Sequence, residues 1–68
     1  MDEIKFARFE GHVFAFRMPP QVIFRRLEGD KFVDIKTSEP WHFMDVLYKG
    51  VPVPASEVPA AALASLPT

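Results

Sequence analysis

The sequence predicts a small α+β domain, in which an antiparallel sheet of four or five strands carries a short C-terminal helix on one face. Two pairs of aromatic and β-branched segments each flank a short turn that contains glycine, the pattern of β-hairpins. The C-terminal residues instead carry apolar side chains at helical spacing. With 68 residues, the chain has room for a single domain, residues 1–68.

The first hairpin is expected to pair strands 4–9 and 13–18, and its register is open between two turn lengths. A two-residue turn places the following residues on one face: Lys5, Ala7, Phe9, Phe14, Phe16 and Met18. A three-residue turn at 10–12 instead gathers a more apolar set, although glycine is then not at its usual last position: Ile4, Phe6, Arg8, Phe14, Phe16 and Met18. Pro19-Pro20 ends the second strand because it removes two backbone donors.

The second hairpin pairs strands 21–28 and 31–37 around Gly29-Asp30, and glycine in first place fits a type II′ turn. This turn predicts five facing pairs: Glu28 with Lys31, Leu27 with Phe32, Arg26 with Val33, Arg25 with Asp34, and Phe24 with Ile35. Two of the pairs join opposite charges, which helps to fix the register. The better core face carries Val22, Phe24, Arg26, Val33 and Ile35. The opposite face carries Ile23, Arg25, Leu27, Phe32 and Asp34.

Residues 38–53 have two interpretations, because short aromatic and β-branched runs do not separate helix from strand by periodicity. In one, Ser38 caps a helix that Gly50 closes. In the other, a fifth strand at 43–48 turns at Lys49-Gly50 and pairs with 51–53, and Pro52 confines that last segment to an edge. We favour the strand, since the sequence from Val46 to Val51 is more typical of a hairpin.

The C-terminal segment predicts a Pro-rich linker at 51–55 followed by a helix at 56–66. Ser56 would cap this helix and Pro67 would stop it. Val58, Ala62 and Leu66 fall on one stripe, with Leu63 beside it. A helix of this length is not stable alone in water, so it must dock on one face of the sheet.

The composition removes several classes of function. The chain has no cysteine, which excludes disulfides and thiolate metal sites, and His12 and His42 lack zinc-site spacing. The three glycines are isolated turn formers, so no phosphate-binding loop or cofactor motif is present. A nucleophile needs a base within reach, and neither histidine is placed to serve one. We therefore expect no enzyme, no cofactor and no metal.

The same features indicate where the protein resides. The acidic, polar start is unlike a secretory leader, and the longest apolar run is far short of a membrane span. Together with the absence of cysteine, this predicts a cytoplasmic protein that does not associate with membranes.

The functional expectation is a non-enzymatic protein-binding module. Both faces of the predicted sheet carry bulky apolar groups, and one tail helix covers only one of them, so the other would meet a partner or a second copy. An edge strand offers a further route, by strand addition. We expect a homodimer or larger at micromolar concentration. The residues predicted to bind the partner are Phe6, Arg8, Arg17 and Arg25, with Trp41 as an outside candidate.

The alternative is a single-stranded nucleic-acid-binding protein. Arginines interleave with phenylalanines along the predicted sheet, and this composition is typical of a surface on which bases stack. The net charge of −1 argues against it, because phosphate contacts dominate nucleic-acid affinity. Salt separates the two hypotheses, since only nucleic-acid binding should weaken steeply with ionic strength.

Overall fold

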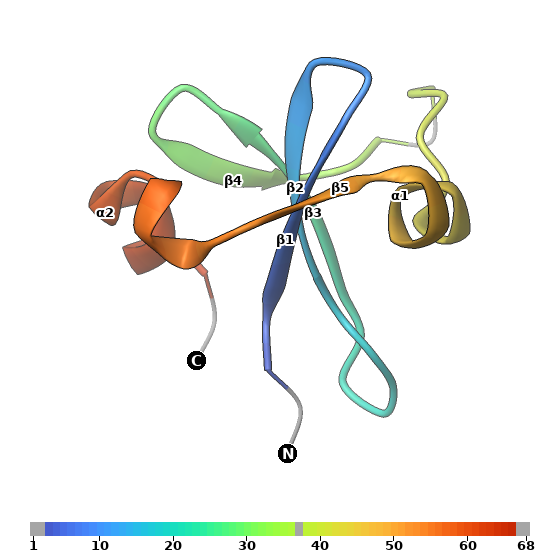
Figure 1. The fold of residues 1–68 in the computed structure, drawn as a ribbon, viewed down its shortest axis with the longest axis horizontal. Coiled ribbons are helices and arrows are strands. Elements are labelled where there is room, and N and C mark those ends of the chain that lie inside the picture. The colour runs from blue at the N-terminus through green and yellow to red at the C-terminus, as the bar shows by residue number, and fades with distance from the viewer. Residues whose placement is uncertain (1–2, 37, 67–68) are drawn as a thin grey trace.

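The computed structural model describes residues 3–36 and 38–66. They form a five-stranded antiparallel sheet with a short helix on each side (Figure 1). The strands, in the order β4-β3-β2-β1-β5, and the helical segments are as follows: β1 (Lys5–Phe9), β2 (His12–Arg17), β3 (Ile23–Glu28), β4 (Lys31–Asp34), α1 (Phe43–Lys49), β5 (Val51–Val53), the 3₁₀ turn η1 (Ala55–Glu57) and α2 (Ala60–Ala64). The predicted α+β class, with an antiparallel sheet and a C-terminal helix, is confirmed.

The first hairpin has the two-residue turn. Phe9 pairs with His12, and the two turn residues Glu10 and Gly11 have φ angles of +52° and +79°. Two consecutive positive φ angles are the signature of a type I′ turn, whose twist matches that of the flanking strands. The three-residue alternative is therefore wrong, because the tight turn fits the strand twist even with glutamate in a left-handed conformation.

The second hairpin follows the predicted register. Four of the five predicted pairs are present, from Glu28 with Lys31 to Arg25 with Asp34. Gly29 has a φ of +66°, as the first residue of a type II′ turn requires. The strand ends at Asp34, so the fifth predicted pair does not form. Residue 37, the expected end of this strand, lies outside the described residues.

Residues 43–49 form helix α1, so the favoured strand at 43–48 is wrong. Phe43, Val46 and Leu47 lie at helical spacing, and this stripe packs on the sheet. Burial of this stripe outweighs the strand preference of a short aromatic run. The helix begins after His42 and not after Ser38, and Gly50 closes it through a hydrogen bond from its N–H to the carbonyl of Val46.

Residues 51–53 form strand β5 and not part of a linker. The strand occupies an edge of the sheet, as Pro52 predicts, but it pairs with β1 instead of with 43–48. Val53 faces Phe6 and Val51 faces Arg8. The chain thus crosses from α1 on one face to α2 on the other through three residues of strand (Figure 1).

The C-terminal helix is shorter than expected. Ser56 lies inside η1, and α2 begins after Pro59, because two prolines at 54 and 59 break the segment into a 3₁₀ turn and a helix. The predicted stripe is nevertheless confirmed, since Val58, Ala62 and Leu66 are all buried. Pro67, expected to stop the helix, lies outside the described residues.

Each face of the sheet has its own core. On the side covered by α2, the rings of Phe6 and Phe32 stack at 5.7 Å. This α2-side core consists of Phe6, Ala15, Phe32, Val53, Val58, Ala62 and Leu66. The α1-side core consists of Ala7, Phe14, Phe16 and Val46, with Phe9, Phe24, Ile35, Trp41, Phe43 and Leu47 packed against it. Helix α1 and Trp41 thus cover the face that was expected to stay open.

Candidate functional site

A pocket of about 410 Å³ lies beside the end of strand β5. Residues from β1, β2, α1, β5 and the start of η1 line it: Ile4, Lys5, Phe6, Ala7, Phe16, Leu47, Gly50, Pro52, Val53 and Ala55. We call it the β5-end pocket. Its volume falls in the range of about 300–1,000 Å³ that is typical of ligand sites.

The pocket arises from the shortness of β5. The strand stops at Val53, opposite Phe6, while the chain of β1 continues past it through Lys5 to Ile4. Residue 55, which would lie opposite Ile4 in a longer strand, is already in η1. The first residues of β1 therefore have β2 on one side and no strand on the other. The pocket lies in this gap at the sheet edge.

Among the described residues, the lining is apolar except for Lys5, the one charged side chain on the wall. Within residues 3–36 and 38–66, no histidine, serine, aspartate or glutamate lines the pocket, so these ranges supply no pair of nucleophile and base to its wall. An apolar concave wall with one cation suits an apolar side chain that is followed or preceded by negative charge.

Two of the predicted site residues lie on strand β1, beside the pocket. Phe6 lines it, but its ring belongs to the α2-side core and only 7% of the residue is exposed, so it is not a free surface anchor. Arg8 is exposed and pairs across the strands with Val51. Both residues lie in the first strand, as expected from the sequence, whereas the depth of Phe6 depends on how α2 docks.

The other predicted site residues do not join these two. The Nε of Arg17 donates a hydrogen bond of 2.7 Å to the carbonyl of Gln21 in the β2–β3 turn. Arg25 pairs with Asp34 at 3.2 Å. Both arginines therefore serve hairpin contacts on β2 to β4, away from β5 in the strand order.

Trp41 is half-buried and packs edge-on against the α1-side core. The centroid of its ring lies 5.0 Å from the ring centroid of His12, 5.5 Å from that of Phe14 and 6.1 Å from that of Phe9. Such edge-to-face pairs contribute about 0.5–1.5 kcal/mol each beyond their area burial. Trp41 thus has a structural role here, as does His12, which lies in β2 and is not a solvated turn residue.

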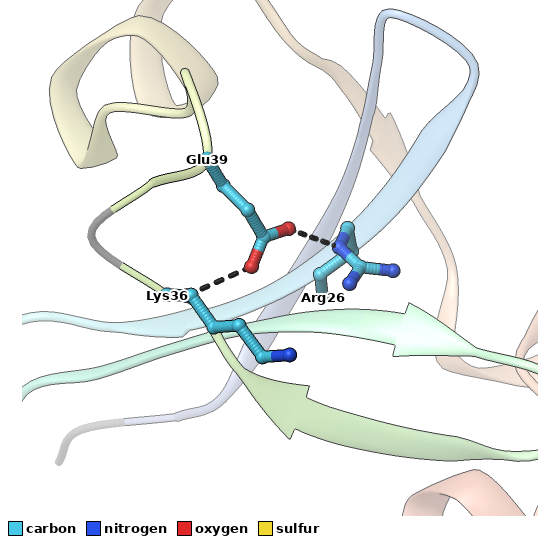
Figure 2. A network of polar contacts seen from close by, with 3 residues as sticks. All are labelled: Arg26, Lys36 and Glu39. Carbon is cyan, nitrogen blue, oxygen red and sulfur yellow. Dashed lines mark hydrogen bonds and ion pairs between the residues drawn. The ribbon is translucent and has the colours of Figure 1, made fainter.

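The segment that carries Trp41 is tied to the sheet by Glu39, a residue that the sequence did not single out (Figure 2). Its carboxylate accepts hydrogen bonds from Arg26 Nε at 2.7 Å and from the Lys36 backbone N–H at 2.8 Å. The side chains of Arg26 and Glu39 are 18% and 17% exposed. The Lys36 amide, followed by the Arg26 guanidinium, lowers the pKa of Glu39. An arginine on a predicted core face was the available signal, because it requires an acidic partner.

The phenylalanines do not form an exposed stacking surface. Phe6, Phe14, Phe16 and Phe32 are buried, and the other three, Phe9, Phe24 and Phe43, are half-buried within the α1-side core. Bases stack on exposed rings. The arrangement of aromatic and arginine side chains therefore offers no support for the nucleic-acid alternative.

The outer edges of the sheet carry features that hinder strand addition. On β4, the N–H of Phe32 donates a 3.0 Å hydrogen bond to Ser65 Oγ on the segment that ends α2. On β5, Pro52 has no N–H, and the pairing of its neighbours with β1 directs its nitrogen outward. Blocking edge amides in this way discourages pairing with other chains.

Two further features were sought in residues 3–36 and 38–66, a cluster of metal ligands and a membrane-spanning helix. No three side chains of histidine, aspartate or glutamate gather there as a metal ion would require. None of the helices in these ranges has the length and hydropathy needed to cross a membrane. Comparison of the chain with protein-family models, with curated proteins and with solved structures gave no match.

Proposed function

We propose that this chain is a non-enzymatic, cytoplasmic protein-binding module that receives an apolar side chain of its partner in the β5-end pocket. The observation that supports the proposal is the pocket itself, an apolar hollow of about 410 Å³ at the sheet edge. Both sheet faces are packed. The proposed binding surface is therefore this edge of the sheet and not the open face that the sequence led us to expect.

The lining is suited to a protein ligand for two reasons. Its walls come from elements packed into both cores, so the site is preformed and loses little conformational entropy on binding. Central apolar anchors that fill such pockets carry most of the energy at protein interfaces. Pro52 and Ala55 supply the exposed apolar part of the wall, where an entering side chain would make first contact.

Peptide display against the purified chain tests the proposal. We expect selected peptides to shift the backbone amide resonances of pocket residues, such as Ala7, Leu47 and Val53, and to leave those of the β3–β4 turn unchanged. Ala55→Trp, at an exposed position of the wall, should weaken binding at least tenfold, whereas Ala64→Trp on the exposed part of α2 should not. Peptides that bind elsewhere, or an absence of any selected binder, would overturn the proposal.

A further inference from the structure

We infer that the sheet also carries a phosphate-binding surface, formed by Arg17, Arg25 and Lys36 on its α2 side, and that this surface takes a phosphorylated serine or threonine of a protein partner. The surface is separate from the β5-end pocket, whose lining contains none of these three residues. Three observations carry the inference: the register that gathers the cations, the contacts that orient the two arginines, and the local excess of positive charge.

The strand register places the three cations on one face of the sheet. Arg17 lies two residues after Ala15, which belongs to the α2-side core and pairs with Arg25. Because side chains alternate between the two faces of a sheet, Arg17 and Arg25 project on the α2 side, at diagonal positions of the β2–β3 pair. Ile35 packs on the α1-side core, so the next residue, Lys36, is directed to the α2 side.

An apolar residue lies among these cations. Ile23 pairs with Arg17, precedes Arg25 by two positions, and is buried although it belongs to neither core. The β3–β4 register, continued past Asp34, brings Lys36 to its other side. The aliphatic stems of long cationic side chains cover an apolar neighbour of this kind while their charged ends stay in water. The three charged ends therefore surround the position of Ile23.

Both arginines are oriented by contacts of their Nε atoms. Arg17 Nε donates a 2.7 Å hydrogen bond to the carbonyl of Gln21, and Arg25 Nε lies 3.2 Å from Oδ1 of Asp34. Among the side-chain hydrogen bonds of the described residues, none involves the terminal Nη atoms of these arginines. The ends of both guanidinium groups are thus positioned but still able to donate, and paired donors of this kind match the oxygens of a phosphate.

The charge of this surface favours a phosphate over a single carboxylate. Three cations stand against one acidic residue, Asp34, whose side chain is 88% exposed. Glu39 is turned to Arg26, which pairs with Phe14 on the α1 side. A phosphorylated side chain carries about −1.5 to −2 charges at pH 7 and three acceptor oxygens, and clusters of arginine recognise it in proteins. The packed phenylalanines leave no rings on which bases could stack, so we choose a protein over a nucleic acid.

Binding of a peptide library with phosphoserine at its centre tests the inference, alongside the same peptides with serine or glutamate there. The phosphorylated members should bind about tenfold more tightly than the serine members, with glutamate between them. Arg17→Lys and Arg25→Lys should each remove most of this preference although the charge is kept, because an ammonium group lacks the paired donors. Arg8→Lys, at an exposed position near the first turn, is the matched control and should leave the preference unchanged.

Amide resonances provide a second measurement, which needs no substitution. Phosphoserine peptides should shift those of Arg17, Ile23 and Arg25. Shifts confined to other residues, or a phosphate preference that survives both lysine variants, would overturn the inference. Equal affinity for inorganic phosphate, or tighter binding of a single-stranded oligonucleotide, would overturn the choice of a protein partner. Ala55→Trp, which alters the wall of the β5-end pocket, should leave phosphate-dependent binding unchanged, so that failure here and failure of the proposed function are separate results.

Discussion

The Nε of Arg26 donates a 2.7 Å hydrogen bond to Oε1 of Glu39, and this contact joins strand β3 to the loop that delivers Trp41. The other carboxylate oxygen of Glu39 accepts from the Lys36 N–H, so one side chain closes the loop and fastens it to the sheet. The loop in turn places an aromatic ring over Phe14, a residue with no exposed surface. The Arg26–Glu39 contact thus positions the Trp41 ring that covers Phe14.

The first prediction concerns acid sensitivity. Because the pKa of Glu39 is lower in the folded chain than in the unfolded chain, its contribution to stability is fully present above about pH 4.3, the ordinary pKa of glutamate, and is lost as the pH falls through the folded-state value. Glu39→Gln should therefore lower the melting temperature more at pH 7 than at pH 3. Glu57→Gln, at an exposed site in η1, is the control and should lower neither. An equal loss at both pH values would contradict the assigned role.

The second prediction concerns the first turn. Glu10 has a φ of +52°, a conformation that asparagine adopts more readily than glutamate and that type I′ turns favour in the sequence Asn-Gly. Glu10→Asn should stabilise the fold by about 0.5–1 kcal/mol, measured as a higher midpoint in urea unfolding. Asp30→Asn is the matched control, since Asp30 does not have a positive φ. A gain from the control and none from Glu10→Asn would refute the type I′ assignment.

The third prediction concerns the contact of α1 with β1. A Cβ added at Gly50 would lie 2.5 Å from the carbonyl oxygen of Val46 and 3.0 Å from the Cβ of Ala7. The φ of Gly50 is −69°, so crowding and not backbone conformation is the obstacle. Gly50→Ala should cost about 1–3 kcal/mol of unfolding free energy. Adding Ala7→Gly should not restore stability, because the tighter contact is with backbone. A fully stable Gly50→Ala chain would show that α1 docks differently.

The fourth prediction concerns the β4 edge. Ser65 Oγ accepts from the Phe32 N–H at 3.0 Å and donates to the Ala62 carbonyl at 2.6 Å. Ser65→Ala should cost about 1 kcal/mol and speed hydrogen exchange at the Phe32 amide. Ser56→Ala, in exposed η1, should leave that exchange unchanged, and Ser65→Thr should retain most of the protection. Unaltered exchange in Ser65→Ala would mean that this hydroxyl does not cap the edge.

The fifth prediction concerns self-association. Met44 and Tyr48 lie one turn apart on the outer side of α1 and are 53% and 75% exposed. We expect the chain to form a dimer at micromolar concentration through this side, because exposed apolar groups of this kind gather at interfaces. Tyr48→Glu should shift sedimentation toward the monomer, whereas Glu57→Lys should not. A monomer at high concentration before any substitution would contradict this prediction.

Local sequence signals predicted the hairpins, while contacts between distant segments decided the rest. The turn at Gly29-Asp30 fixes its own register, and four predicted pairs form. Helix α1 was the less favoured of two interpretations, because the strand-like composition of the segment is overruled by burial of Val46 against the sheet. The pairing of β5 with β1 joins Phe6 to Val53, a separation that no local pattern reveals.

The candidate site was harder to predict than the fold. Phe6 was among the partner-binding residues predicted from the sequence, and it lines the pocket. The pocket itself depends on β5 ending at Val53, after which the chain turns into η1. The arginines were assigned to a partner surface, whereas Arg17 and Arg25 are engaged within the hairpins. Charge and aromatic content do not show which side chains are engaged in contacts within the fold.

The position of β1 between β2 and β5 has a consequence for the order in which the fold is completed. Strand β1 receives its second neighbour only when residues 51–53 are in place, and α2, which covers one of its faces, follows later in the chain. A chain in which only β1 to β4 have formed would therefore display an unpaired edge of β1 and two uncovered apolar faces. Unpaired strand edges and exposed apolar surface of this kind are prone to aggregate. Residues 43–64 contribute only three strand residues and two short helices. They nevertheless pair the free edge of β1 and cover both faces of the sheet.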